Sequence, residues 1–319
     1  MVLIFILAVI AVSLLSLCIY CFKTCFYASN HAPHDPYSQL HGQQFLAVED
    51  KIYASTRSME LVPFEEVSIK SFDGLNLSGR YYHYQEGAPV KIIFHGYRSY
   101  ALRDSAGGFC MARKFGMNVL AVDQRAHGKS GGHVITFGIL ERRDCLSWIQ
   151  YINHRCGADT PIILSGLSMG AATVVMAASL PLPENVVCVL ADCPYSSPKE
   201  IICKVCKDEH FPVALAYPFI KFSAKLFGNF DLEETDAVDA VTRSKTPILL
   251  LHGEDDRFVP CEMSRKIHAS SNGCTQLRTF LDAGHGLSYM VAPVEYEKAV
   301  FDFLYTFQEL REYMDRTHV

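Results

Sequence analysis

The sequence has no cluster of basic residues. Its 29 Lys and Arg residues are scattered along the chain and are outnumbered by 34 Asp and Glu residues, which gives a net charge of -5. Proteins that bind the phosphate backbone of nucleic acids usually carry a basic patch or stripe, so nucleic acid is not an expected partner. Internal repeats are also absent from the 319 residues, and this length predicts one large domain with a substantial core.

Charged residues, proline and glycine are all missing from residues 2–22. A helix of this length reaches roughly the 30 Å of a bilayer core. A cleaved signal peptide usually has a basic start and a small-residue cleavage site, and a helix that is apolar on every side would be unusual at the terminus of a single soluble domain. We therefore expect a single-pass transmembrane anchor over residues 1–25, and Lys23 favours a cytosolic position for the domain that follows.

The twelve cysteines do not follow a pattern that requires disulfides or a metal. Three lie in or beside the apolar run, and the other nine are an odd number. Several sit in apolar segments, where free cysteine behaves as a small hydrophobic residue. The pair Cys203 and Cys206 lacks the second pair of ligands that a structural zinc site needs. We expect mostly reduced cysteines and no metal site.

The rest of the chain has the pattern of an α/β protein. Residues 26–60 read as a polar connector without a sustained period, and from residue 61 short β-rich runs alternate with helical patterns. Such alternation is typical of βαβ units and a mainly parallel sheet. Strands are expected over residues 66–71, 75–82, 90–94, 118–122, 161–164, 186–190, 247–251 and 277–281. Helices are expected over residues 103–115, 140–154, 171–179, 265–270 and 294–311.

One long insertion interrupts this alternation between the sixth and seventh expected strands. Residues 197–244 show no strand pattern and contain an aromatic-rich helical stretch. Because it joins two strands of one sheet, the insertion must lie over one end of that sheet. We expect an α/β domain over residues 61–319 that carries this insertion as a small helical cap.

Ser168 lies between two glycines in GLSMG, where an expected strand gives way to an expected helix. A serine on such a sharp turn crowds the backbone beside it, so the flanking positions need glycine. The start of the helix also directs free N–H groups at the serine oxygen. The pattern fits a nucleophile, although a structural turn serine would satisfy it as well.

A serine nucleophile needs an acid and then a histidine at the ends of later strands. The seventh expected strand leads into HGEDDRFVP, which contains Glu254, Asp255 and Asp256. The eighth ends in DAGHG, which contains His285. An exposed acid or a histidine between glycines is common in turns, but the presence of all three groups in this order predicts a catalytic triad.

Ester or amide hydrolysis through a serine also requires an oxyanion hole made of two backbone N–H groups. Met169 follows the serine and supplies one amide in the usual position. The third expected strand leads into His95-Gly96-Tyr97, where the glycine lets the chain turn so that the amide of Tyr97 can point into the site.

Together these motifs resemble the α/β-hydrolase superfamily, in the branch of small prolyl-oligopeptidase-like and FrsA-like hydrolases and acyl esterases. The matching segments are FHGY, DQRAHGKS, GLSMGA, HGEDDRFVP and AGHG, and the resemblance runs from about residue 61 to the C-terminus, about four fifths of the chain. The resemblance implies an α/β-hydrolase fold, with Ser168 as nucleophile, Asp256 as orienting acid and His285 as general base. It gives His127 and Arg125 a structural role, and Ala126 replaces the glycine that is usual in that turn.

The activity that the resemblance implies is hydrolysis of carboxylic esters by a serine hydrolase, without a cofactor or metal. A small-molecule or lipid ester near the bilayer is the expected substrate. Aromatic residues of the cap and of the preceding strand end are candidates either for an acyl pocket or for simple packing: Tyr195, Phe211, Tyr217, Phe219 and Phe222.

Two other functions remain open at this point. The same triad cleaves peptides and other amides, although the chain is too short to include a propeller domain. A membrane-tethered binding protein on an inactive hydrolase fold is the second alternative. Such a protein would typically lack a member of the triad, and none is missing from this sequence.

Overall fold

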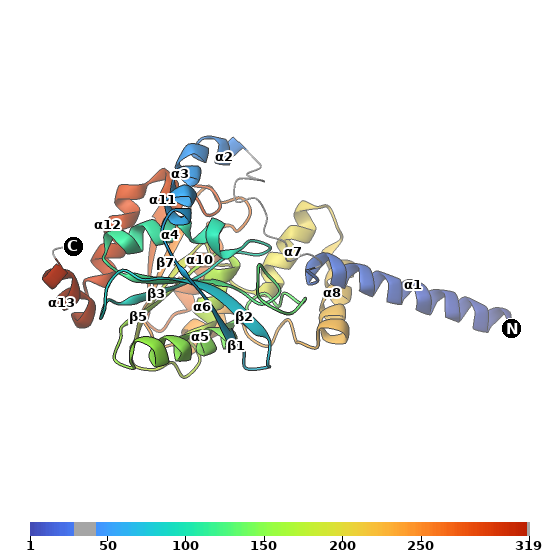
Figure 1. Cartoon of the computed structure of the whole chain (residues 1–319). Helices are drawn as coiled ribbons and strands as arrows, with labels where there is room; N and C mark the ends of the chain where they lie inside the picture. Colours follow the sequence, from blue (N-terminus) through green and yellow to red (C-terminus); the bar gives the residue numbers. More distant parts are fainter. Residues whose placement is uncertain (29–42, 318–319) are drawn as a thin grey trace.

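The computed structural model describes residues 1–28 and 43–317 of the chain (Figure 1). Its centre is an eight-stranded sheet in the order β1-β2-β4-β3-β5-β6-β7-β8. The strands are β1 (Glu65–Lys70), β2 (Asn76–Tyr82), β3 (Val90–Phe94), β4 (Asn118–Asp123), β5 (Ile162–Leu167), β6 (Val186–Asp192), β7 (Ile248–Gly253) and β8 (Thr275–Phe280). All eight correspond to expected strands, with ends that differ by three residues or fewer.

The sheet is mainly parallel, as predicted. Only β1 with β2 and β2 with β4 pair in the antiparallel direction, and every later neighbour is parallel. Parallel strands end at the same edge of a sheet, and in open α/β sheets ligands bind outside these carboxyl ends. Phe94 of β3 lies beside Gly166 of β5, which in turn lies beside Ala191 of β6. The loops after these central strands therefore meet at one edge.

Helices cover both faces of the sheet. One apolar core joins it to α3 (Glu49–Glu60), α4 (Ala101–Lys114), α12 (Pro293–Leu304) and α13 (Gln308–Thr317). A second core joins its other face to α5 (Glu141–Cys156), α6 (Met169–Ala177), α9 (Ala237–Arg243) and α10 (Cys261–Ser270). The central strands read as continuous apolar runs because both of their faces are buried in these cores.

Two helical predictions need correction. The connector expected over residues 26–60 contains α2 (Gln43–Leu46) and α3, and buried Ile52 and Met59 attach α3 to the domain. The single helix expected over residues 294–311 is two helices, α12 and α13. Tight turns from Thr306 to Phe303 and from Phe307 to Leu304 end the first helix. Part of the predicted connector lies in residues 29–42, outside the described residues.

The insertion between β6 and β7 is helical, as predicted. It forms α7 (Pro198–Asp208), α8 (Val213–Gly228) and α9. The apolar α1 (Val2–Cys25) packs its last turns against α8, and its N-terminal part projects away from the domain (Figure 1). Phe22 lies 5.5 Å from Phe227, and Phe26 lies 5.4 Å from Phe230, between ring centroids. The helical insertion therefore packs against the C-terminal end of α1.

The first part of α1 makes little contact with the domain. Within this helix only Cys18 and Cys21 are buried, and the side chains nearer its start are exposed. The helix is long and apolar enough to cross a membrane, a property that signal sequences near the N-terminus share. The contacts of its last turns therefore position α1 on the domain.

Candidate active site

Ser168 occupies a strained turn between β5 and α6. Its backbone has φ 54° and ψ -114°, a conformation that residues with a side chain seldom adopt. The two glycines of GLSMG make the turn possible. A Cβ on Gly166 would lie 2.2 Å from the carbonyl of Gly170, and one on Gly170 would lie 2.1 Å from the oxygen of Phe94. Glycine is therefore required on both sides of Ser168 because a Cβ at either position would overlap backbone atoms.

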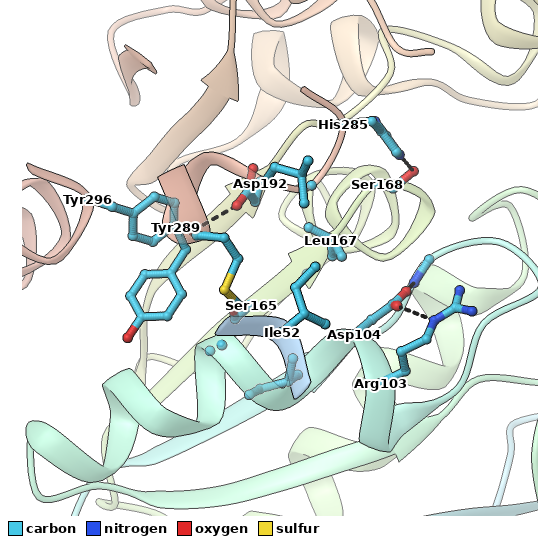
Figure 2. Close-up of a pocket in the computed structure, with 18 of the residues that line it drawn as sticks. Ile52, Arg103, Asp104, Ser165, Leu167, Ser168, Asp192, His285, Tyr289 and Tyr296 are labelled. Carbon is cyan, nitrogen blue, oxygen red and sulfur yellow. Dashed lines mark hydrogen bonds and ion pairs between the residues drawn. The ribbon is translucent and has the colours of Figure 1, made fainter. Parts of the chain in front are cut away.

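A hydrogen-bonded chain links Ser168, His285 and Asp256. Nε2 of His285 lies 3.0 Å from Oγ of Ser168, and Nδ1 lies 2.7 Å from Oδ2 of Asp256. Figure 2 shows the first of these bonds at the edge of the cavity described below. Two hydrogen bonds thus link a serine to a histidine and the histidine to a carboxylate, an arrangement that can activate a serine.

Asp256 is held by more than its bond to His285. Its Oδ1 accepts hydrogen bonds from the amides of Phe258 and Val259, at 2.9 and 2.8 Å, while Nε2 of His252 lies 3.3 Å from Oδ2. Burial works to raise the pKa of Asp256, but hydrogen bonds from His252 and His285 outweigh it and hold the pKa well below its usual range. The carboxylate is therefore ionised and fixed. Asp255, the alternative acid from the sequence, is exposed.

The loop after β3 carries Tyr97, the expected second oxyanion donor. Oδ2 of Asp104 accepts a hydrogen bond from the amide of Gly96 at 2.8 Å, and Nε2 of His127 accepts one from the amide of Arg98 at 3.0 Å. These bonds fix the residues on either side of Tyr97. Met169 is the first residue of α6, so its amide is among those with no acceptor inside the helix. Both amides stand at the edge of the sheet where Ser168 lies.

The turn that follows β4 contacts the loop of Tyr97 through His127. Arg125 is buried and forms two bonds of 2.7 Å to Asp144, together with bonds of 3.0 and 3.2 Å to Asp73. Ala126, which replaces the usual glycine, has φ 62°. The alanine thus adopts the left-handed conformation that glycine takes more easily. This turn supplies His127 to the loop of Tyr97.

The loop of Tyr97 and Arg98, the candidate oxyanion loop, is also bonded to the end of α1. The hydroxyl of Tyr97 donates to the carbonyl of Cys25 at 2.9 Å, and Nη2 of Arg98 donates to the carbonyl of Thr24 at 2.7 Å. The last carbonyls of a helix have no partner within it, so both side chains act as a C-terminal cap. The sequence gave no sign of this link, because it joins residues more than 70 positions apart.

A cavity of about 280 Å³ opens beside Ser168 and runs along the face of the sheet that α4 covers (Figure 2). Its volume is close to the lower end of the range for small-molecule sites. Much of the wall is apolar: Phe45, Ile52, Ile93, Met111, Leu167, Leu287 and Met290. Phe45 and Ile52 come from α2 and α3, so helices that the sequence analysis took for a connector cover the site.

The predicted pocket residues need correction. Over the described residues, the lining of this cavity includes none of Tyr195, Phe211, Tyr217, Phe219 and Phe222. Tyr195 and Tyr217 are buried in the core that joins the cap to the end of α1, and Phe219 packs against that core. Phe211 and Phe222 are exposed. The cap faces α1 and α6 instead of the cavity, and the packing alternative describes these aromatics better.

Arg103 and Asp104 also line the cavity, together with two buried charged residues that the sequence did not predict. Lys91 of β3 and Asp192, the last residue of β6, both belong to its wall, and both are buried. Burial lowers the pKa of Lys91 to about 8 and raises the pKa of Asp192 to about 6. The signal was present in the strand VKIIF, where a single lysine interrupts an apolar run.

One group of side chains has the composition of a metal site. Ligand atoms of Cys193, Asp256 and His285 lie within 4.8 Å of one another. Burial raises the pKa of the Cys193 thiol well above its usual value, whereas a metal-bound cysteine must be a thiolate. Asp256 and His285 are already bonded to each other and to Ser168. This set of groups suits proton transfer better than metal binding.

Comparisons with known proteins agree with this geometry. A family model described as "Alpha/beta hydrolase family" matches residues 92–299. The uncharacterized protein YqkD of Bacillus subtilis is 26% identical over 254 residues, which cover 79% of this chain and 82% of that protein. Human protein ABHD12B is 26% identical over 206 residues, which cover 58% of this chain and 50% of that protein.

A solved structure gives the same result. The structure of an esterase from Pyrococcus furiosus superimposes with a TM-score of 0.63 and 25% sequence identity. The match covers 79% of this chain and 93% of the esterase. The superposition supports an esterase-like hydrolase fold for this chain.

Proposed function

Because the chain belongs to the alpha/beta hydrolase family, we propose that it is a serine hydrolase that cleaves carboxylic esters through an acyl-enzyme on Ser168. The observation that carries the proposal is the chain of two hydrogen bonds, 3.0 Å from Ser168 to His285 and 2.7 Å from His285 to Asp256. The likeness to the Pyrococcus furiosus esterase favours an ester over an amide as the substrate.

In the first half of the reaction, Oγ of Ser168 attacks the ester carbonyl while Nε2 of His285 takes its proton. Asp256 accepts the Nδ1 proton of the histidine in a hydrogen bond, which holds the tautomer and stabilises the imidazolium. His285 then returns the proton to the alcohol as it leaves. In the second half, His285 activates a water molecule that hydrolyses the acyl-enzyme.

The negative charge that develops on the carbonyl oxygen is stabilised by the amides of Tyr97 and Met169. Losing one donor of an oxyanion hole typically costs about 3 kcal/mol of transition-state stabilisation. Asp104 and His127 hold the loop of Tyr97 through its neighbours, so the donor is in place before the substrate arrives. A donor that is already fixed loses little free energy in reorganisation during the reaction.

The substrate class follows from the cavity and from α1. The mainly apolar wall suits the acyl part of a lipophilic ester, and α1 acts as a single-pass anchor that holds the domain at a membrane, on the cytosolic side. Residues 1–25 are then the anchor, and the catalytic domain predicted over residues 61–319 also includes α2 and α3, which line the cavity. Cleavage that stays confined to short, water-soluble esters would argue against this substrate class.

The test is covalent labelling of the full chain in detergent with a fluorophosphonate, followed by intact-mass spectrometry. We expect one adduct, which the Ser168→Ala variant loses and the Ser179→Ala variant retains. Ser179 follows the same helix at its far end, where its hydroxyl bonds to the carbonyl of Met176, so it controls for the loss of a serine. A folded protein that takes up no label would overturn the proposal.

A further inference from the structure

Helix α8 of the cap carries apolar side chains on two opposite faces. One face is buried in the core that also holds the end of α1, and its members are Tyr217, Ile220 and Ala224. The other face holds Leu215, Phe222 and Leu226, whose exposed fractions are 66%, 57% and 50%. Residues three, four and seven positions apart lie on the same side of a helix, so these three form one exposed stripe. We call them the outer stripe of α8.

The outer stripe is accompanied by a further aromatic residue and by positive charge. Phe211, just before the helix, is 53% exposed. Helix α8 contains Lys221 and Lys225 and no acidic residue, and Lys225 is exposed. Apolar residues on the surface of a soluble protein are usually scattered singly. A helix with phenylalanine and leucine on one face and lysines beside them is instead typical of segments that lie in a membrane interface.

The outer stripe belongs to the side of the domain from which α1 projects. Helix α8 lies at that end of the domain and runs across the direction of α1 (Figure 1). The ring of Phe22 lies 5.5 Å from that of Phe227, between centroids, and a Cβ on Gly228 would stand 3.3 Å from the ring of Phe22. A membrane that α1 crosses would therefore face the end of the domain that holds α8.

The length of α1 brings this end of the domain up to the membrane. Cys18 is the first buried residue of α1, so residues 2–17 are the part that is free of the domain. They reach about 24 Å at roughly 1.5 Å per residue, which is less than the roughly 30 Å of a bilayer core. To span the core, α1 must also use its next turn, which contains Cys21 and packs with the cap. The cap beside α1 then lies at the membrane interface.

We propose that the outer stripe of α8, together with Phe211, inserts into the lipid surface of the membrane that α1 crosses. The proposal rests on the proposed function, because α1 must act as the anchor. The apolar face of an interfacial helix lies about 5–10 Å into the boundary between headgroups and acyl chains. Lys225 can extend its ammonium group to the lipid phosphates while its stem covers apolar surface.

A second copy of the chain is a poorer partner for this surface. Stable protein interfaces use about 20–30 residues on each side, whereas the outer stripe and Phe211 offer only four large side chains. Contact with lipid also has a consequence for the site. The loop of Tyr97 and Arg98 is bonded to Thr24 and Cys25 at the end of α1, so it is held close to the same membrane surface, where a lipophilic ester would enter.

Tryptophan fluorescence tests the contact in the full-length chain, reconstituted in phosphatidylcholine vesicles. The sequence has a single tryptophan, Trp148, which is buried and gives a background that the unmodified chain measures. Phe222→Trp and Leu226→Trp each place a reporter in the outer stripe. We expect bromine on the lipid acyl chains to quench both reporters, more strongly when it is near the headgroup than when it is near the methyl end.

Tyr305→Trp is the matched control for an exposed aromatic residue. Tyr305 is 36% exposed and directly follows α12, which lies at the end of the domain away from α1 (Figure 1). Its emission should not change with brominated lipid. Thermal unfolding of each variant identifies a reporter that has disturbed the fold, and the second reporter on the stripe then gives the answer.

The outcomes distinguish this contact from the proposals on which it depends. Quenching of both stripe reporters without quenching of Tyr305→Trp supports the contact. Stripe reporters that stay unquenched in a chain that floats with the vesicles would overturn it, and a blue-shifted emission without quenching would show that protein covers the stripe instead. Equal quenching of Tyr305→Trp would also overturn it.

A chain that does not float with the vesicles would overturn the anchor and the contact together. Fluorophosphonate labelling of Ser168 is independent of these results, so its absence would overturn the hydrolase proposal alone.

Discussion

Gly170→Ala tests whether the contact between the nucleophile turn and β3 is as close as the structure shows. Gly170 is the second residue of α6. A Cβ at this position would lie 2.1 Å from the carbonyl oxygen of Phe94 and 2.6 Å from that of His95. Both atoms belong to the backbone, so no side-chain rotation can relieve the overlap. The change adds one methyl group at a position where the start of α6 meets the end of β3.

The expected cost follows from the size of the overlap. A carbon and an oxygen in contact normally lie about 3.3 Å apart, so α6 and the end of β3 must separate by about 1 Å. Overpacking of this kind costs about 1–3 kcal/mol and occasionally more, and we take about 3 kcal/mol because backbone must move. For a domain of this size, a loss of about 3 kcal/mol lowers the melting temperature by roughly 6–12 °C.

Reactivity should fall more steeply than stability. Ser168 moves with α6, whereas the oxyanion loop moves with β3, so the separation changes the distance between the nucleophile and the amide of Tyr97. A displacement of about 1 Å in a catalytic arrangement can cost roughly a hundredfold in rate. Thermal unfolding measures the first effect, and the rate of fluorophosphonate labelling at Ser168 measures the second at a temperature where the variant is folded.

Gly87→Ala is the matched control for the change of glycine to alanine. Gly87 has φ +72°, and a Cβ there meets nothing within 4 Å. Its substitution should cost about 1–2 kcal/mol from backbone conformation alone and leave labelling unchanged. A Gly170→Ala protein that melts and labels like the unmodified chain would refute the close contact and, with it, the role given to the second glycine.

Charged side chains at the site give three more predictions. Asp256→Asn should slow labelling of Ser168 by about 10³ to 10⁴-fold, as expected when an amide favours the wrong tautomer of His285, while the circular dichroism spectrum stays unchanged. Burial raises the pKa of Asp192 from 3.8 to about 6, so the folded chain holds this proton at pH values where the unfolded chain releases it. The free energy of unfolding of the unmodified chain therefore falls as pH rises from about 4 to 6. Asp192→Asn does not have this loss, so its stability relative to the unmodified chain should rise by up to about 3 kcal/mol over that range and stay constant above it, as measured by urea unfolding at several pH values. Arg125→Met leaves the buried carboxylate of Asp144 without its partner and should cost about 3–5 kcal/mol, again by urea unfolding.

Each of these predictions has a result that contradicts it. Labelling of Asp256→Asn within about tenfold of the unmodified rate would show that another group orients His285. A stability difference for Asp192→Asn that does not change between pH 4 and 6 would place the proton elsewhere. For Arg125, the exposed Lys245→Met variant is the control for loss of a positive charge, and equal stability of the two variants would remove the structural role of the turn after β4.

The strands and the linked groups of the site were predictable because each depends on local sequence. A parallel strand buried on both faces reads as an apolar run. Ser168 follows the run of β5 directly, Asp256 lies three residues after that of β7, and His285 lies five residues after the edge strand β8. The glycines around the serine reflect contacts within a few residues and across one neighbouring strand. Signals of this range survive in a single sequence.

The wall of the cavity was not predictable in the same way. Beside residues of the central strands, it includes residues of α2, α3, α4 and the segment after β8, and these meet only once the chain has folded. The aromatic residues of the cap were a reasonable choice for a pocket by composition. The direction in which their side chains point depends on packing, however, and α8 packs on α1. Lys91 could have been noticed as a charge inside an apolar strand, although the sequence does not tell which face of the sheet receives its side chain.

The bonds from Tyr97 and Arg98 to the last turn of α1 have a practical consequence for enzymology. A fragment that starts after Phe26, and therefore lacks α1, would be the natural choice for expression in soluble form. Such a fragment would lose the carbonyl acceptors of Thr24 and Cys25, and it would uncover the apolar surface on which Phe26, which is fully buried, normally rests. The loop of Tyr97 and Arg98 would then sample positions that the complete chain does not allow. Turnover measured on the truncated fragment would describe a hydrolase whose oxyanion loop has lost one of its supports.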